Sequence, residues 1–311
     1  MAFASFDIHD ILHPLDLAAR QQLEKIPGLQ LAAKKYRSVI ADRRDRALLL
    51  SNAIRLGPDQ VSDYYRLLPP ICEAFGIEQP ELYLAAGSAN AMTLGHSRPC
   101  VVLHTELLST LPPEEIQAVL AHECGHILAE HVLYRQMAMT VFSGVETLGG
   151  KFGTAVSLFS EPLKAALLDW YRKSELTADR AAVMFMGGPR ELQQALFHLH
   201  GMPHTMPKDQ ISYAAFAAQA DELDSVMGEK KLDRYLMRHL DREGTHPNAA
   251  LRFREVQRWA ESEAYRQLMA IAQRTGPAPC GHCGEPVRAD WLFCQKCGTE
   301  LGATAGAGAG S

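Results

Sequence analysis

Apolar residues recur every three or four positions through most of the chain, which is the period of an amphipathic helix. This spacing predicts helices over residues 14–25 and 29–56, and a further helix over residues 57–75 that bends at Pro69-Pro70. From Pro113 onward the pattern is helical again. Glycine and proline interrupt it at residues 149–150, 187–189 and 202–203.

Three short apolar segments between these helical regions predict β-strands, at residues 82–85, 89–94 and 100–103. Turn residues separate them, at residues 87–88 and 97–99. Because the connections are this short, we expect the strands to form a small meander. The expected fold class is therefore α+β, mostly helical, with a small sheet.

The composition is that of an ordinary globular protein, with 311 residues of which 47% are apolar and 22% charged. A formal net charge of −5 gives no general attraction for nucleic acid, so none is expected as a partner. No run of about 18–20 apolar residues predicts a transmembrane helix. The N-terminus lacks the basic start and apolar run of a signal peptide, so we expect a cytoplasmic protein.

The strongest chemical signal is a His-Glu-x-x-His motif at residues 122–126, on the helix expected to begin near Pro113. Positions four apart share one face of a helix, so His122 and His126 can both point at one metal ion. Zinc binds neutral imidazole well and is commonly four-coordinate. Glu123 can then reach a metal-bound water without binding the metal itself. The alternative is a helix with two partly buried histidines and a solvated glutamate.

A second pair of residues four apart supplies carboxylates, at Glu175 and Asp179. A catalytic zinc bound by two histidines needs a third protein ligand and an open position for water, and Glu175 meets that need. A ligating histidine also needs a carboxylate on its other ring nitrogen to fix its tautomer, and Asp179 can serve His122 in this way. Taken without the histidine motif, the two residues could equally form a surface pair.

These motifs resemble those of the HtpX-like and CAAX-prenyl-endopeptidase group of gluzincin metallopeptidases, family 48 of the metallopeptidases. The resemblance covers about residues 60–260, and its order of motifs is specific to the family but not to a substrate. It is carried by residues 121–126 with 129–131, residues 175–180, residues 245–247 with Arg252, and residues 90–92 ahead of Gly95.

The resemblance implies a role for each matching residue. His122, His126 and Glu175 would bind the catalytic zinc, and Glu123 would be the general base. His246 would approach the zinc centre, where it could stabilise an oxyanion or occlude the metal; alternatively, it marks the start of a helix opened by Pro247. The strand with Asn90, Ala91 and Met92 would pair with an extended substrate, or else be an ordinary edge strand.

Membrane members of the family carry transmembrane helices before the zinc site or between the histidine motif and the glutamate ligand. Here charged residues interrupt residues 137–169, which we interpret as a helical hairpin that covers the cleft. Peripheral membrane contact remains an alternative. The basic helix expected over residues 29–56 allows the same two readings, a solvated outer face or a face on an anionic membrane.

A second metal signal lies near the C-terminus, where Cys280, Cys283, Cys294 and Cys297 form two C-x-x-C-Gly knuckles. Four thiolates predict a closed structural zinc site, and the knuckle glycines permit the positive φ of a tight turn. His282 is an alternative ligand. Residues 291–293 are the expected core of this zinc ribbon. The ribbon is not basic, which favours protein contact or simple support over nucleic acid.

Taken together, these motifs predict a zinc metalloendopeptidase that acts on protein or peptide substrates and holds one catalytic and one structural zinc ion. The rival hypothesis is a catalytically idle zinc protein that binds misfolded or partner chains through its edge strand and ribbon. The oligomeric state is not predicted. The expected organisation is an N-terminal helical segment at 1–56, a metallopeptidase domain at 57–274, a linker at 275–279, a zinc ribbon at 280–300 and a disordered tail at 301–311.

Overall fold

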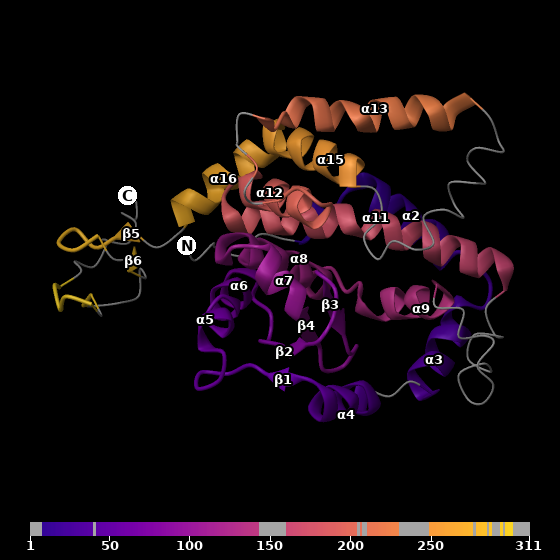
Figure 1. Cartoon of the computed structure of the whole chain (residues 1–311), viewed down its shortest axis with the longest axis horizontal. Coiled ribbons are helices and arrows are strands. Elements are labelled where there is room, and N and C mark those ends of the chain that lie inside the picture. Colours follow the sequence, from indigo (N-terminus) through magenta and orange to yellow (C-terminus); the bar gives the residue numbers. More distant parts are fainter. Residues whose placement is uncertain are drawn as a thin grey trace, which may run out of the picture.

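The fold is mostly helical and contains a small sheet, as the sequence predicts (Figure 1). The computed structural model describes residues 8–39, 42–142, 160–203, 206, 210–229, 249–275, 278–284, 286–287, 293–294 and 296–300. The predictions for His246 and for the tail at 301–311 lie outside these residues. So does the middle of the expected hairpin, at 143–159.

The helices of the described residues are α1 (Ile8–Ile11), α2 (Pro14–Glu24), α3 (Leu29–Val39), α4 (Asp42–Asn52), α5 (Ser62–Tyr65), α6 (Leu68–Phe75), α7 (Thr105–Thr110), α8 (Pro113–Leu128), α9 (Val132–Phe142), α11 (Glu161–Met186), α12 (Arg190–Leu199), α13 (Tyr213–Glu229), α15 (Ala249–Glu261) and α16 (Glu263–Thr275). The strands are β1 (Ile54–Arg55), β2 (Glu81–Ala85), β3 (Ala91–Leu94), β4 (Cys100–His104), β5 (Ala278–Pro279) and β6 (Pro286–Val287).

Two of the predicted helices are wrong in their extent. The helix expected over residues 29–56 is divided into α3 and α4, and Ile54 and Arg55 leave the helical path to pair with β2. The helix expected over residues 57–75 is divided into α5 and α6. Pro69 and Pro70 lie in the first turn of α6, where a missing N–H removes no helical hydrogen bond, so they begin a helix and do not bend one.

The predicted meander is also wrong, because the strands lie in the order β1-β2-β4-β3. β2 and β4 are parallel, with Leu82 opposite Val101, whereas β3 runs antiparallel to β4. Cys100, Val101, Val102 and Leu103 are all buried, as suits a central strand that is covered on both faces. β3 is consequently left at the edge of the sheet, next to α8.

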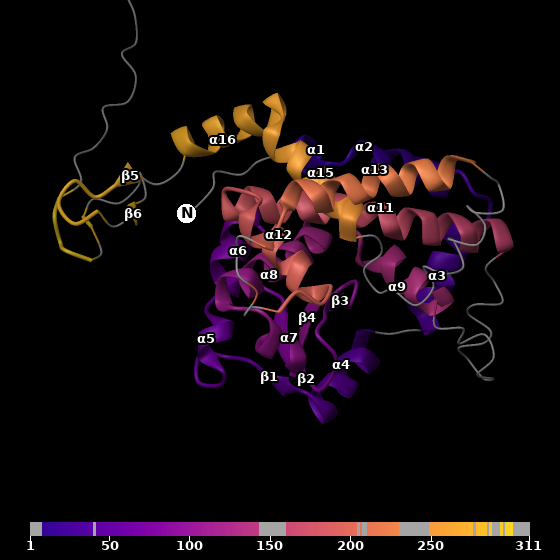
Figure 2. The same ribbon diagram turned by 45° about the horizontal axis from the view of Figure 1, so that its top comes forward.

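The long helix α11 packs across α8 and forms the centre of the molecule (Figures 1 and 2). A residue without a side chain allows this contact. A Cβ atom placed on Gly125 of α8 would lie 2.8 Å from the Cβ of Ala181 and 3.1 Å from the Cα of Ala178, both on α11. The two helix backbones therefore approach at a distance that only glycine permits. On the other side, α8 packs against α6 and β3, and these contacts build the main apolar core.

The N-terminal helices pack on the same centre. α2 lies along α11, and with α3 and α9 it forms a second apolar cluster that includes Leu23, Leu29, Met137 and Trp170. Arg180 on α11 donates to the carbonyl of Leu12 at 3.0 Å, just before α2 begins. None of the helices in the described ranges is long and apolar enough to cross a membrane.

The Gly125 contact leads to a test by substitution. Gly125→Ala should lower the free energy of unfolding by about 1–3 kcal/mol, because the added methyl group has no room between the helices. Helix propensity alone would raise the stability by about 1 kcal/mol, so the two effects have opposite signs. Gly188→Ala is the matched control, since a Cβ atom placed there would meet no atom within 4 Å and little change is expected. Chemical denaturation measures both variants. A stabilised Gly125→Ala protein would contradict the close crossing.

Candidate metal centre

The three predicted zinc ligands converge between α8 and α11. His122 and His126 lie one turn apart on α8, and Glu175 reaches them from α11. The two ring Nε2 atoms are 3.2 Å apart. Oε2 of Glu175 is 3.5 Å from His122 Nε2, and Oε1 is 3.4 Å from His126 Nε2. All three side chains are buried.

These separations fit a zinc ion. Nitrogen and oxygen ligands about 2.0–2.2 Å from a tetrahedral zinc lie ~3.4 Å from one another, which is close to each of the three separations above. His122, His126 and Glu175 therefore have the identity, number and spacing of a three-ligand zinc site.

Asp179 fixes the orientation of the His122 ring. His122 Nδ1 lies 2.9 Å from Asp179 Oδ1, so Nδ1 carries the proton and Nε2 faces the other two proposed ligands, His126 and Glu175. Burial alone would lower the pKa of His122, but its hydrogen bonds to Asp179 and Glu175 raise it to about 9. Arg252 on α15 holds the carboxylate in turn, with donors 2.6 and 2.8 Å from the two oxygens of Asp179.

Two buried arginines hold the carboxylate of Glu175. Arg135 on α9 makes a short hydrogen bond to Oε1, and its guanidinium lies 4.3 Å from the centre of the Tyr171 ring. Arg252 approaches Oε2 at 3.3 Å. Each oxygen of Glu175 thus faces one histidine and one arginine. The two guanidinium groups therefore offset the burial of this carboxylate.

The second ligand ring has a different partner. His126 Nδ1 lies 3.0 Å from Nδ1 of His131, which follows the end of α8. Burial, followed by the nearby charge of Arg135, keeps the pKa of His126 well below its ordinary value. A neutral ring is the form that binds zinc.

Glu123 is buried and lies between the ligands and the sheet. Oε2 accepts a hydrogen bond of 2.7 Å from the hydroxyl of Thr93 on β3. Oε1 has no hydrogen-bond partner among the residues that the structure describes. The edge strand therefore orients this carboxylate, and one oxygen is left for a water molecule or a substrate.

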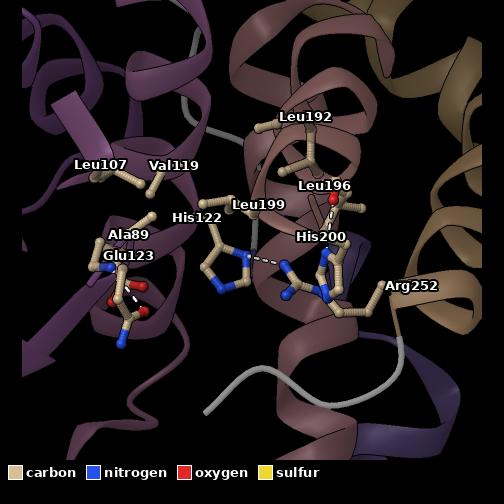
Figure 3. A pocket seen from close by; sticks show the side chains of 13 residues that line it. Ala89, Leu107, Val119, His122, Glu123, Leu192, Leu196, Leu199, His200 and Arg252 are labelled. Atoms are coloured by element: carbon tan, nitrogen blue, oxygen red, sulfur yellow. Dashed lines mark hydrogen bonds between the residues drawn. The ribbon is translucent and has the colours of Figure 1, made fainter. Parts of the chain in front are cut away.

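A pocket of about 230 Å³ opens beside this centre (Figure 3). His122, Glu123, His200 and Arg252 line it on the polar side. The rest of the wall is mostly apolar and comes from α7, α8 and α12, through Leu107, Val119, Leu192, Leu196 and Leu199.

The expected substrate strand is only partly at the pocket. Asn90 and Ala91 line it, and the side chain of Asn90 accepts a hydrogen bond of 2.9 Å from the N–H of Ala91. Met92 packs instead on the other face of the sheet with Tyr83 and Val102.

Several residues at this centre were not singled out by the sequence. Arg135 and Thr93 carry no motif, because their partners lie 40 and 30 positions away. Arg252 and His131 belong to segments of the family resemblance, but no role followed for them from spacing alone. In each case the missing information is the packing of one helix or strand against another.

The four cysteines also converge. Cys280 and Cys297 Sγ atoms are 3.6 Å apart and those of Cys283 and Cys294 are 3.7 Å apart, close to the ~3.8 Å expected around a tetrahedral zinc with bonds of about 2.3 Å. Gly284 and Gly298 both have a φ of 72°, which is the positive φ that the knuckles require. A hydrogen bond with Thr299 lowers the pKa of Cys297 to about 6, which favours the thiolate.

The predicted core of the ribbon is wrong for Phe293, which is 52% exposed. Trp291 and Leu292 lie outside the described residues. Because a segment this small has few apolar residues, a bound metal can organise it in place of a packed core.

The histidine motif at the crossing of α8 and α11 and the cysteine knuckles together indicate a metalloprotease with a zinc ribbon. Comparison with known sequences agrees. The description of peptidase family M48 matches residues 66–260, and that of a zinc-ribbon domain matches residues 280–301. The chain belongs to peptidase family M48, which confirms the resemblance seen in its sequence.

Named relatives include the plastoglobule-localized metallopeptidase 48 of Arabidopsis thaliana chloroplasts. It is 32% identical over 280 residues, which cover 88% of this chain and 79% of the relative. Protease HtpX homologs of Nostoc sp. and Trichormus variabilis are 27% and 26% identical over 187 residues, covering 52% of this chain and 65% of each relative. No solved structure matches the chain.

The geometry predicts different effects for the two carboxylates of α11. Glu175→Gln removes a ligand and should abolish zinc binding at this centre at micromolar free zinc. Asp179→Asn leaves all three ligands in place but releases the His122 ring, which should weaken zinc binding about 10–100-fold. Zinc titration of each purified variant against a competing chelator measures both. If Asp179→Asn lost the metal and Glu175→Gln kept it, the two roles would have to be exchanged.

Proposed function

We propose that the protein is a zinc-dependent endopeptidase that hydrolyses peptide bonds in extended segments of protein substrates. The observation that carries this proposal is the buried triad of His122, His126 and Glu175 with the Glu123 carboxylate beside it, next to a pocket that His122 and Glu123 line. Membership of family M48 supports the same reaction.

Glu123 is the proposed general base. A zinc ion held by the triad would polarise the peptide carbonyl and lower the pKa of the attacking water towards about 7. The Glu123 carboxylate accepts the proton of that water through the oxygen that Thr93 leaves free, and passes it to the leaving amine. His246 is proposed, from the family resemblance, to stabilise the oxyanion.

The substrate is proposed to lie along β3. β3 is an edge strand, so one row of its backbone groups can pair with an extended peptide. Asn90 and Ala91 lead from this strand into the pocket. The leucines of α12 and α7 and Val119 make the pocket suitable for an apolar side chain of the substrate.

We assign a catalytic role to the zinc of the triad and a structural role to that of the ribbon. The ribbon has four thiolates and no open position, whereas the triad leaves one position for water. Location in the cytoplasm stays a prediction. One relative is named for plastoglobules, and peripheral contact with a lipid surface is the alternative.

A test of the reaction itself uses Glu123→Gln. The amide keeps the shape of the side chain but cannot accept the proton, so cleavage of fluorescein-labelled casein should fall at least about 100-fold while the zinc content stays at two ions per chain. Glu114→Gln changes an exposed glutamate of the same helix and is the control. Undiminished cleavage by Glu123→Gln would exclude this mechanism. An inactive wild-type protein across a panel of unfolded substrates would favour the idle zinc protein.

The two zinc roles predict a stoichiometry. The full chain should hold two zinc ions, and a chain ending at Thr275 should hold one and still cleave casein, because the triad lies wholly before the ribbon. Metal analysis by mass spectrometry after gel filtration measures both forms. Equal metal contents would show that the ribbon is not a zinc site, and loss of both ions on truncation would show that the two sites are not independent.

A further inference from the structure

The face of the His126 ring that points away from Glu175 begins a chain of buried polar groups. His131 Nδ1 lies 3.0 Å from His126 Nδ1, and the opposite nitrogen of His131, Nε2, lies 3.2 Å from Oδ2 of Asp16. The second contact has an ion-pair distance but is not a hydrogen bond in the structure. All three side chains are at most 1% exposed, so bulk water does not reach these contacts.

Asp16 is held in position from α11. The hydroxyl of Thr177 donates to Asp16 Oδ2 at 2.5 Å and accepts a hydrogen bond of 3.0 Å from the N–H of His13. His13 is the residue before α2, and its ring accepts a hydrogen bond from the N–H of Leu15 in the first turn. The start of α2 is therefore fixed against the helix that carries Glu175, and Asp16 lies on its first turn.

An unusual backbone conformation brings His131 under the zinc ligand. Glu130 has a φ of 56°, in the left-handed region that residues other than glycine seldom adopt. This turn folds the chain back at the end of α8, so that the N–H of His131 donates to the carbonyl of His126 at 2.9 Å. The strain of this conformation is of the order of 1–2 kcal/mol, and it occurs at the turn that places His131 beside His126.

Zinc binding would determine which ring nitrogen carries the proton in His126 and in His131. If His126 binds zinc through Nε2, its single proton lies on Nδ1 and is donated to His131 Nδ1. His131 must then accept at Nδ1 and carry its own proton on Nε2, where it faces the carboxylate of Asp16. A carboxylate accepts only, so Asp16 favours this tautomer of His131, which in turn favours the zinc-binding tautomer of His126.

We propose that Asp16, on the N-terminal helix α2, is a positioning residue that fixes the metal-binding tautomer of His126 through His131. This rests on the zinc site proposed above. α2 lies outside residues 66–260, the part of the chain that matches the family, so this segment adds a residue to the metal centre that the match does not contain.

The two ligand rings are then supported in parallel ways. His122 donates directly to a carboxylate, that of Asp179. His126 reaches its carboxylate, that of Asp16, through an intervening ring. The Trp170 ring packs edge-to-face with this intervening ring, and the ring centres are 5.3 Å apart.

The test measures zinc affinity in the full-length protein by competition with a chelator of known affinity. The ribbon zinc is an internal reference, because its affinity should be the same in every variant. Asp16→Asn keeps the size of the side chain and removes the charge, and we expect the affinity of the triad to fall about 10–100-fold. Asp10→Asn is the control, since it removes the same charge from an exposed position of the same N-terminal segment and should change nothing.

A double-mutant cycle separates positioning from general support of the fold. His131→Phe should weaken zinc binding about as much as Asp16→Asn, and the two together should weaken it no more than about twofold beyond His131→Phe alone, because Asp16 acts only through His131. Wild-type affinity in Asp16→Asn would overturn the proposal. Losses that multiply in the double variant would also overturn it, since Asp16 would then act by another route.

One measurement needs no variant and stays decisive if these substitutions prevent folding. Nitrogen NMR of histidine-labelled, zinc-loaded wild-type protein should show His131 with its proton on Nε2 alone. A proton on Nδ1 of His131 would overturn the proposal. Neither this spectrum nor the zinc affinity depends on cleavage, so failure of the peptidase function would leave both results readable.

Discussion

The zinc centre depends on how closely α8 and α11 cross. Gly125, within the histidine motif itself, lets the backbone of α11 approach at Ala178 and Ala181. The two histidines and the two carboxylates project from the facing sides of these helices, so the crossing sets the spacing of the ligand atoms. A side chain at this position would separate the helices, and a separation of a few tenths of an ångström is comparable with the tolerance of a zinc–ligand bond.

Buried charge is the main energetic difficulty of this arrangement. Glu123, Glu175, Asp179 and two arginines are buried, and isolated burial of any one of them would cost several kcal/mol. The structure offsets this cost by pairing. Arg135 and Arg252 share Glu175, Arg252 also holds Asp179, and a bound zinc ion would add the remaining positive charge. The same pairs fix the side chains in place, so the stability and the geometry of the site have a common origin.

Periodicity was enough to predict the local part of the centre. His122 and His126, and likewise Glu175 and Asp179, are four residues apart on single helices, so their shared faces follow from the helix alone. The order of the strands could not be predicted from the sequence. β4 lies in the middle of the sheet because it pairs in parallel with β2, and the lengths of the turns do not indicate such a pairing. Thr93, Arg135 and Asp16 were missed for the same reason, since each meets its partner only through tertiary packing.

We infer that the crossing of α8 and α11 forms a zinc site with three protein ligands and leaves Glu123 unbound. A crystal structure of the zinc-loaded protein, with anomalous diffraction measured on both sides of the zinc edge, would locate the metal. One zinc peak is expected about 2.0–2.2 Å from His122 Nε2, His126 Nε2 and a Glu175 oxygen, and a second peak is expected among the four cysteines. A peak bonded to Glu123, or no peak between the two helices, would contradict it.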